Sequence, residues 1–379
     1  MFNLQNNQYM LITEGKTQFY VPRNSIDTSP PPRNPAFFNT LAKFKRDTLI
    51  TILNTYASQF DEKITFADVL SSIGATGMRI ANESNYIKKI YFNDANPIAI
   101  DFLNRSIERN NFGSFCATSN NEANKFLSNF SGKEDRFDFI DLDPFGSPVP
   151  FIDSAIRALK INGIISITAT DGAVLCGVYP EVCLRKYGSL SLNTEYFNEI
   201  AIRILFSTLS TIACRNNLGV EPIFCHTDKH YIRVYAKVVN SVSSSEGNHG
   251  FLQHCIKCGN RNISKHPYTS CNLCDADCKI AGPLWTGKLF DKLLLTESLK
   301  LSINTKLTKL LEIALTEVSL PSMYYVTDKI SQDLQISSFS VEKIVEKLQN
   351  HGFESSKTAF NPKGFRTNGN ISDINKLLL

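Results

Sequence analysis

The chain has 379 residues, of which 42% are hydrophobic and 20% charged, and its formal net charge is +4 at pH 7. This length allows two domains of ordinary size, and the composition is that of a soluble globular protein. No apolar run approaches the roughly 18–20 residues that cross a bilayer, and the polar N-terminus MFNLQNNQYM has no features of a secretion signal. We therefore expect a cytoplasmic protein without membrane contact, in which any affinity for nucleic acid comes from local basic patches.

The first 240 residues alternate short apolar runs with amphipathic segments, a pattern typical of a parallel sheet covered by helices. The predicted strands cover residues 64–70, 88–94, 137–142, 162–170 and 230–239, and the predicted helices cover 97–110, 149–160 and 199–213. The polar stretch 241–250 predicts a linker. After it, helical segments near 289–316 and 340–350 precede a short extended end. The sequence thus predicts an α/β domain over 1–240 and a second, smaller α+β domain over 250–379.

A glycine-containing turn follows the first predicted strand of the α/β domain. The segment ADVLSSIGATGMRIA (67–81) runs from a strand through Gly74 and Gly77 into a helix, which lets the backbone approach a ligand or simply makes a tight turn. The next strand ends at Asp94, where a carboxylate can accept hydrogen bonds from both ribose hydroxyls. An adenosyl ligand is favoured over NAD, and the alternative role for Asp94 is to cap the helix that begins near Pro97.

The loop after the third strand offers two further contacts to an adenosyl group. In NNEANKFL (120–127), Glu122 can accept a hydrogen bond from the adenine amine. Ala123 offers a small surface and a backbone N–H. This loop is therefore expected to lie beside the adenine.

The segment FDFIDLDPFGSPVPF (137–151) is the most specific feature of the α/β domain. Its apolar strand ends in Asp143, Pro144 and Phe145, at the sheet edge where ligands bind in open α/β folds. Asp143 and the Pro144 carbonyl can accept N–H bonds from an exocyclic amine and orient it for methyl transfer, while Phe145 offers a face for base stacking. The alternative is an ordinary turn at the end of a strand.

Four of the ten cysteines have the spacing of a zinc ribbon. Cys255-x2-Cys258 and Cys271-x2-Cys274 are separated by twelve residues, so two close pairs can complete a tetrahedral thiolate site. A site with four protein ligands is closed, which predicts a structural zinc ion. Cys278 or His254 could replace one ligand, and two disulfides are the other alternative.

Basic residues gather near this cluster and near the C-terminus. They are expected to contact the phosphates of a nucleic acid, with an ordinary solvated surface as the alternative. They comprise Lys257, Arg261, Lys265, Lys279, Lys357, Lys363 and Arg366.

Taken together, these motifs resemble the tRNA (guanine-26-N2) dimethyltransferases, in the compact form typical of archaea. The matching segments are EGKTQFYVP (14–22), FFNTLAKFKRD (37–47), DVLSSIGATGMR (68–79), NDANP (93–97), FDFIDLDPFGSPVPFIDSAI (137–156), TATDGAVLCGVYPEVCLRKYG (170–188), DKHYIRVYAKV (228–238), GPLWTGKL (282–289) and NPKGFRT (361–367). The resemblance implies a Rossmann-like class I methyltransferase domain with a C-terminal tRNA-binding domain, which carries the zinc ribbon-like cluster 255–274 and a winged-helix-like unit.

The resemblance also implies an activity and residue roles. The protein would transfer one or two methyl groups from S-adenosyl-L-methionine to N2 of guanine 26 in tRNA, as a monomer that does not bind DNA. Asp143 would be the catalytic carboxylate, and Phe37 and Phe145 would sandwich the guanine. The residues implied to bind the cofactor are Arg46, Arg79, Asp94, Glu122 and Ala123.

Two positions depart from the family's pattern. Relatives usually have Asp where Glu122 stands, and the glycine turn reads Ser-Ser-Ile-Gly-Ala-Thr-Gly where many members have Ser-Ala-Thr-Gly-Ile-Arg-Gly. These differences affect the details of cofactor contact. A methyltransferase acting on another RNA base and a non-catalytic zinc-containing RNA-binding protein are the competing hypotheses.

Overall fold

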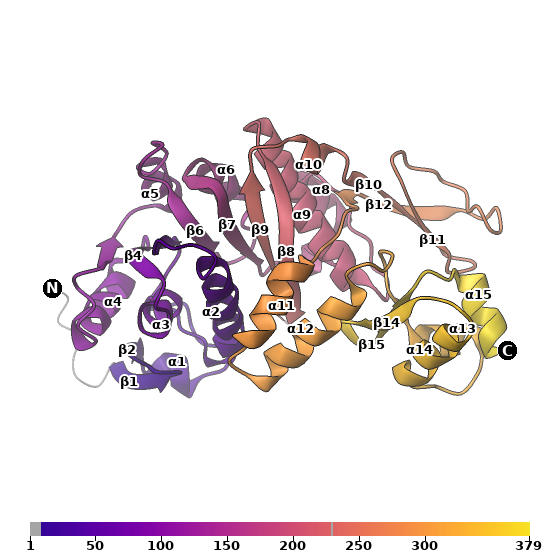
Figure 1. Cartoon of the computed structure of the whole chain (residues 1–379), viewed down its shortest axis with the longest axis horizontal. Helices are drawn as coiled ribbons and strands as arrows, with labels where there is room; N and C mark the ends of the chain where they lie inside the picture. Colours follow the sequence, from indigo (N-terminus) through magenta and orange to yellow (C-terminus); the bar gives the residue numbers. More distant parts are fainter. Residues whose placement is uncertain (1–8, 229) are drawn as a thin grey trace. The chain divides into compact units, whose positions relative to one another are not determined.

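The computed structural model describes residues 9–228 and 230–379. They form two compact units, whose segments alternate along the chain (Figure 1). Unit 1 comprises Met1–Pro144, Pro150–Ile167 and Glu297–Thr308, and unit 2 comprises Phe145–Val149, Thr168–Thr296 and Lys309–Leu379. These units do not coincide with the predicted domains 1–240 and 250–379, whose separate roles stay predictions. Residues 1–8, on which the expectation about a secretion signal rests, lie outside the described residues.

Unit 1 is built around parallel strands that are buried on both faces, which is why they read as nearly continuous apolar runs. Each strand predicted in this part of the chain is present: β3 (Ile64–Asp68), β4 (Ile87–Asn93), β6 (Phe137–Leu142) and β7 (Leu159–Ala169), with β5 (Cys116–Ser119) in addition. All the pairings among them are parallel. The sheet order is β5-β4-β3-β6-β7-β9-β8, where β8 is Gly219–Asp228 and β9 is Tyr231–Val239. The strand of this sheet that comes first along the chain, β3, therefore lies inside the sheet.

Helices and one hairpin cover this part of the sheet. Helix α4 begins at Pro97, where the Asn96 side chain accepts a hydrogen bond from the Ile98 N–H at 3.0 Å. The hairpin β1–β2 packs against α3 and α4 through a core that includes Phe19 and Phe102 (Figure 1). The elements are β1 (Tyr9–Glu14), β2 (Thr17–Pro22), α1 (Asn24–Asp27), α2 (Lys43–Ala57), α3 (Ala75–Glu83), α4 (Pro97–Arg109), α5 (Ala123–Ser128) and α6 (Val149–Arg157). A 3₁₀ turn at Thr40–Ala42 precedes α2.

Unit 2 contains one long apolar helix, α9 (Phe197–Arg215), which corrects the expectation that no run reaches the length of a membrane span. By length and composition α9 could cross a bilayer. However, 72% of its most apolar window is buried, as in the core helix of a soluble protein. This single helix is therefore weak evidence for a membrane span. The neighbouring elements along the chain are α7 (Gly172–Leu175), α8 (Pro180–Tyr187), β8 (Gly219–Asp228) and β9 (Tyr231–Val239).

A three-stranded antiparallel sheet carries the cysteine-rich segment of unit 2. Its order is β11-β10-β12, with β10 (His249–Cys255) between β11 (Arg261–Ser264) and β12 (Cys278–Trp285). The predicted linker 241–250 is shorter than expected, because it contains a helical turn, α10 (Ser243–Glu246), and the start of β10.

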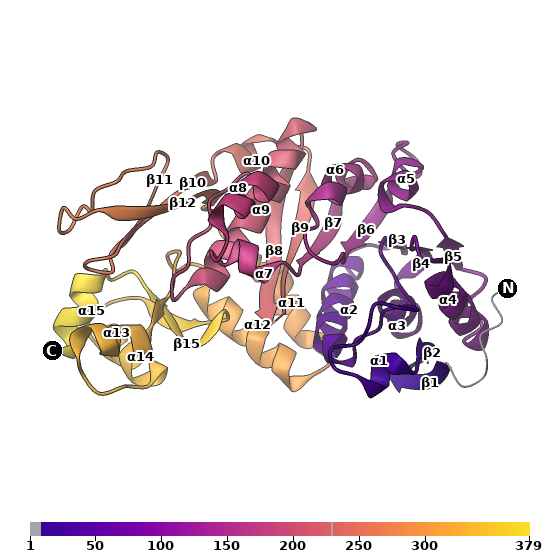
Figure 2. The same cartoon turned by 180° about the vertical axis from the view of Figure 1, so that it is seen from behind.

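The resemblance implied a winged-helix-like unit formed by helices in 289–350. In the C-terminal part of unit 2, two helices of that range accompany a small sheet that extends to Thr367 (Figure 2). Its sheet has the order β13-β15-β14, and the helices α13 and α14 lie between β13 and β14 along the chain. The elements are β13 (Tyr325–Val326), α13 (Thr327–Leu334), α14 (Val341–Asn350), β14 (Ser355–Thr358), β15 (Asn361–Thr367) and α15 (Ile371–Leu378). The predicted extended end is wrong beyond β15, because Asn370 and Asp373 form a capping box that starts α15.

The predicted helical region 289–316 is two helices, α11 (Lys292–Lys300) and α12 (Thr305–Glu317). Asn304 lies directly before α12, and its side chain accepts a hydrogen bond from the Leu307 N–H at 2.8 Å. This cap starts a new helix instead of continuing the first one. The segment Glu297–Thr308, which joins the two helices, belongs to unit 1.

Candidate active site and metal centre

Acidic side chains gather at the carboxyl ends of the parallel strands in unit 1. Asp68 ends β3, Asp94 follows β4, and Asp141 and Asp143 stand at the end of β6. Burial raises the pKa of Asp68 well above its usual value, and the charges of Asp141, Asp143 and Asp94 raise it further, although the Gly77 N–H lowers it. Asp68 pairs in register with Asp141 on β6 and with Phe92 on β4, so Asp143 and Asp94, which follow these two strands, lie at the same edge of the sheet. The sequence analysis missed Asp68 and Asp141. The signal that could have found them is an acidic residue inside an otherwise apolar strand.

Asp94 joins the glycine turn to the loop after β4. Its Oδ2 accepts a hydrogen bond from the Ser72 N–H at 2.7 Å, and its Oδ1 accepts one from the Asn96 N–H at 2.8 Å. Burial raises the pKa of Asp94, against the lowering effect of these two donors. The residue that caps α4 is Asn96, so the alternative interpretation of Asp94 as the helix cap is wrong. Each Asp94 oxygen keeps a further lone pair for a ligand hydroxyl.

Phe37 is anchored beside the same turn. The Ser72 hydroxyl donates to the Phe37 carbonyl at 2.7 Å and accepts from the Phe37 N–H at 3.2 Å. Ser72 thus connects the backbone of Phe37 to Asp94. An open, shallow surface depression is lined by Asn34, Pro35, Ala95, Asn96 and Ile98, which include the two residues that follow Asp94 in the chain.

The glycines of the turn serve packing in this structure. A Cβ atom on Gly74, where φ is +76°, would lie 2.3 Å from a Leu103 methyl group. A Cβ on Gly77 would lie 2.3 Å from the Phe92 ring. Any side chain at either position would push α3 away from β4 and α4. The glycines therefore allow close packing of helix against strand, and their approach to a ligand stays a prediction.

The third loop is held by a residue that the sequence analysis missed. The fully buried Asn93 donates to the carbonyls of Val69 and Asn121, at 3.1 and 3.0 Å, and so clips the loops after β3 and β5 together. Glu122 is exposed and accepts from the Lys125 N–H at 3.0 Å as the cap of α5. Ala123 follows it and is buried. Their proposed contact with adenine stays a prediction. The sequence signal that could have found Asn93 is a side-chain amide directly before Asp94, at the end of a strand.

Asp143 forms an ion pair that the sequence analysis also missed. The Lys45 ammonium on α2 contacts its Oδ2 atom. The Lys45 side chain is 13% exposed and that of Asp143 is 24% exposed. A short, partly buried charge pair thus connects the proposed catalytic carboxylate to the first turn of α2.

In unit 2, Phe145 is presented by a turn that Thr170 closes. The Gly146 N–H donates to the Thr170 hydroxyl at 2.6 Å, and the Thr170 N–H donates to the Gly146 carbonyl at 2.9 Å. Next along the chain, Asp171 accepts from the Tyr187 hydroxyl at 2.6 Å. Phe145 remains 50% exposed, which suits a ring that stacks on a base.

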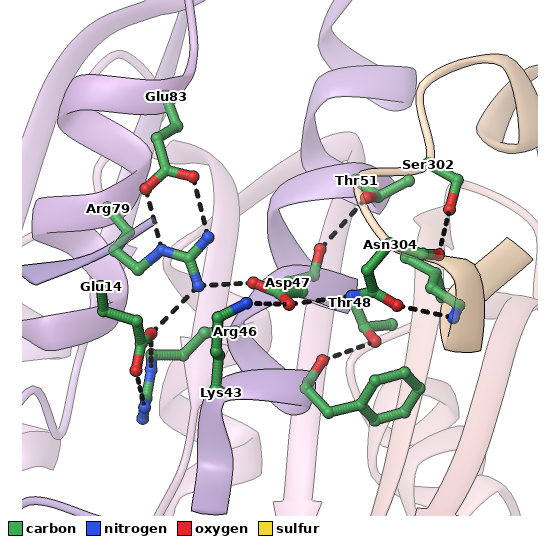
Figure 3. Close-up of polar contacts among 12 residues, drawn as sticks. Glu14, Lys43, Arg46, Asp47, Thr48, Thr51, Arg79, Glu83, Ser302 and Asn304 are labelled. Atoms are coloured by element: carbon green, nitrogen blue, oxygen red, sulfur yellow. Dashed lines mark hydrogen bonds and ion pairs between the residues drawn. The ribbon is translucent and has the colours of Figure 1, made fainter. Parts of the chain in front are cut away.

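Arg46 and Arg79 belong to a buried network in unit 1 (Figure 3). Glu14 accepts from Arg46 Nε at 2.7 Å and Nη2 at 2.6 Å, and from Arg79 Nη1 at 3.0 Å. Arg79 also contacts Asp47 at 2.6 Å and Glu83 at 2.8 Å. These guanidinium groups therefore hold β1, α2 and α3 together, and their direct contact with a cofactor stays a prediction.

The four expected thiols cluster in unit 2, where they could hold a metal ion. The Sγ atoms of Cys255, Cys258, Cys271 and Cys274 all lie within 4.8 Å of one another. The Cys255–Cys274 and Cys258–Cys271 pairs are 3.6 Å apart, close to the roughly 3.8 Å edge of a tetrahedron with 2.3 Å zinc–sulfur bonds. All ten cysteines are free, so the disulfide alternative is wrong. The donor set fits a closed structural zinc site.

The two alternative metal ligands occupy other positions. His254 Nδ1 lies 2.7 Å from the Tyr196 hydroxyl, with which it shares a hydrogen bond. Cys278 stands opposite Cys255 on the neighbouring strand and is not one of the four clustered thiols.

Two of the seven predicted phosphate contacts are buried. Arg261 pairs with Glu195 at 2.5 Å and lies 4.1 Å from the centres of the Tyr196 and Tyr325 rings. Arg366 is 3% exposed and pairs with buried carboxylates. The prediction that these two residues contact phosphates is therefore wrong, because neighbouring acids and rings remove both from solvent.

The remaining basic residues are not buried. Lys357 and Lys363 lie at the surface and form ion pairs with Glu342 and Asp328. Lys257, Lys265 and Lys279 are likewise exposed. Their contacts with phosphates stay predictions.

Comparison with known proteins gives matches over nearly the whole chain. The family model described as N2,N2-dimethylguanosine tRNA methyltransferase matches residues 15–379. Relatives from Methanosphaera stadtmanae and Methanobrevibacter smithii, both named tRNA (guanine(26)-N(2))-dimethyltransferase, are 32% and 33% identical to it. Each alignment covers 97% of this chain and 96% of the relative.

A relative from Aquifex aeolicus, named tRNA (guanine(26)-N(2)/guanine(27)-N(2))-dimethyltransferase, is 31% identical over 97% of this chain and 95% of its own length. The solved complex of Trm1 from Pyrococcus horikoshii with S-adenosyl-L-methionine is similar in structure, with a TM-score of 0.84 at 27% identity. That match covers 97% of this chain and 99% of the other. The predicted fold class, a Rossmann-like methyltransferase domain with a smaller part that contains a four-cysteine cluster, is confirmed.

Proposed function

Because this chain belongs to the N2,N2-dimethylguanosine tRNA methyltransferase family, we propose that it transfers one or two methyl groups from S-adenosyl-L-methionine to N2 of guanine 26 in tRNA. The observation that supports the assignment of residues is the register of three neighbouring strands. Asp68 on β3 pairs with Asp141 on β6 and with Phe92 on β4, so the proposed catalytic carboxylate Asp143 and the proposed cofactor carboxylate Asp94 each follow a strand beside the same strand end. Binding of an adenosyl group and activation of an amine can therefore occur at one site.

The proposed cofactor residues fit an adenosyl group. Asp94 offers two carboxylate oxygens to a ribose diol. Ala123 and Glu122 begin α5 on the loop that Asn93 fastens to the glycine turn. Arg46 and Arg79 support the site by holding α2 and α3 in place. The bound cofactor supplies an activated methyl group on its sulfonium.

The chain's contribution to catalysis is to bind and orient the amine. We assign Asp143 to accept an N–H from the exocyclic amino group, so that the nitrogen lone pair points at the methyl carbon. The N–C bond forms as the S–C bond breaks, and the proton on the nitrogen then passes to solvent. Most of the rate enhancement comes from this alignment. Phe37 and Phe145 are proposed to stack on the base, a role that the exposure of Phe145 supports.

Nucleoside analysis tests the proposed reaction. The protein is incubated with unmodified tRNA and methyl-labelled cofactor, and the digested nucleosides are identified by mass. We expect N2-methylguanosine and N2,N2-dimethylguanosine in wild type, and neither in Asp143→Ala, whose cofactor affinity measured by calorimetry should persist. Label in adenosine or cytidine would assign another RNA base. Absence of both cofactor binding and product would favour the non-catalytic alternative.

We also propose that the protein works in the cytoplasm as a monomer, with tRNA as its macromolecular partner and without binding DNA. The ten free cysteines and the four-thiolate site suit a reducing compartment. The same zinc-ribbon segment and the winged-helix-like part are proposed to bind the tRNA body. Their surface lysines, not Arg261 or Arg366, would contact its phosphates.

A further inference from the structure

Lys45 occupies an unusual position for a lysine. It lies in the first turn of α2, and its side chain is only 13% exposed. Lysine is seldom buried to this extent without a partner, because its ammonium is strongly hydrated and its side chain is flexible. Here the ammonium contacts Asp143 Oδ2, although the two residues are 98 positions apart in the chain.

The surroundings of this ion pair are rich in negative charge. Asp68, Asp141 and Asp94 belong to the same group of strand ends as Asp143. Like charges placed together favour protonation of one or more carboxylates. Burial is the main cause of the raised pKa of Asp68, and the neighbouring carboxylate charges raise it further. A protonated Asp143 would present an O–H where the amine requires an acceptor.

We propose that Lys45 is a positioning residue for methyl transfer, which keeps Asp143 ionised by binding its Oδ2, so that the carboxylate can also accept an N–H from the guanine amino group. A carboxylate has two oxygens with about four lone-pair sites, so both contacts fit on one side chain. The contact also restrains the side chain of Asp143, because α2 is tied to β1 through Arg46 and to α3 through Asp47. The inference rests on the proposed catalytic role of Asp143.

Lys45→Gln tests the proposal, since it removes the charge and keeps most of the side-chain length. Lys45→Arg restores a cation, and Asp143→Asn tests the carboxylate itself. Lys88→Gln is the matched control: Lys88 is an exposed lysine of unit 1 near the amino end of β4, at the opposite edge of the sheet. For each variant, the cofactor Kd is measured by calorimetry, the fold by circular dichroism, and the single-turnover rate on tRNA between pH 5.5 and 9.

We expect Lys45→Gln to lower the single-turnover rate at neutral pH by about 10- to 100-fold, the effect of a misaligned reacting group, with a cofactor Kd close to that of wild type. The rate should also begin to fall at a higher pH than in wild type, because Asp143 has lost its counter-ion. Lys45→Arg should recover part of the rate and the original pH profile. Combined with Asp143→Asn, the Lys45→Gln change should cause little further loss, because the two residues act as one unit.

Three results would contradict parts of the proposal. If Asp143→Asn is inactive while Lys45→Gln keeps the wild-type rate and pH profile, Lys45 has no positioning role and the proposed function stands. If Asp143→Asn is fully active, the catalytic assignment itself fails. A Lys45→Gln variant that loses rate with an unchanged pH profile would also refute the role of the ion pair. A loss of rate that persists in Lys45→Arg would identify a folding defect.

Discussion

Glu14 is the residue whose replacement tests the buried network of unit 1 most directly. It is 8% exposed and binds two guanidinium groups through three hydrogen bonds, two from Arg46 and one from Arg79. Glu14→Gln keeps the volume and removes the charge. Glu14 is the carboxylate that pairs with Arg46, so the variant takes the counter-charge away from a guanidinium that is 5% exposed.

Removing one partner of a buried ion pair costs about 3–5 kcal/mol. With an unfolding entropy of roughly 2.1 cal/mol/K per residue, a chain of 379 residues should lose about 4–6 °C in Tm. The assay is thermal unfolding followed by circular dichroism, with urea unfolding as a second measurement. Asp61→Asn, at an exposed carboxylate of the same unit, is the control and should change Tm by less than about 1 °C.

The double variant Glu14→Gln with Arg46→Met separates charge balance from packing. It removes one charge of each sign, so we expect it to lose less stability than the sum of the two single variants. An unchanged Tm in Glu14→Gln, or strict additivity in the double variant, would refute the account of Glu14 as the counter-ion that joins β1 to α2 and α3.

Three further predictions concern unit 2. First, we expect one zinc ion per chain by elemental analysis; Cys271→Ser should lose it and Cys278→Ser should keep it, and the reverse pattern would show that the ligands are assigned wrongly. Second, burial opposes the ionisation of Glu199, but the charges of Arg366 and Arg203 outweigh it and lower its pKa to about 2. The ionised Glu199 therefore contributes to stability above pH 4.5, and this contribution is lost as the pH falls toward 2. In acid unfolding curves, the stability difference between wild type and Glu199→Gln should shrink over that range. A stability difference that does not depend on pH would contradict this. Third, Thr170→Val leaves the Gly146 N–H without its acceptor and should lower kcat about 10-fold through the turn that carries Phe145, with the cofactor Kd unchanged; a wild-type kcat would show that this hydrogen bond does not matter.

Some of the site was predictable because its information is local. Asp143 and Asp94 each directly follow an apolar strand, so their shared sheet edge follows from the strand pattern alone. Cys255 and Cys258, with their partners, were assigned from spacing, because two thiols three residues apart can chelate one ion. Family resemblance then extended these positions to an expected reaction.

Other features depended on residues that are far apart in the chain. Lys45 and Asp143 are 98 positions apart, and Arg46 and Glu14 are 32 apart. No periodicity relates such pairs, so the sequence could not distinguish a guanidinium that contacts a ligand from one that binds a buried carboxylate. Arg366 illustrates the same limit, since a cation expected at the surface is 3% exposed.

What the sequence determined by itself was the type and order of most strands and helices, the acidic strand ends and the cluster of four cysteines, because hydrophobic period and motif spacing act over a few residues. What only the tertiary structure decided was which charges meet. The free energy of burying a charge depends on the partner that the fold brings to it, and that partner lies elsewhere in the chain.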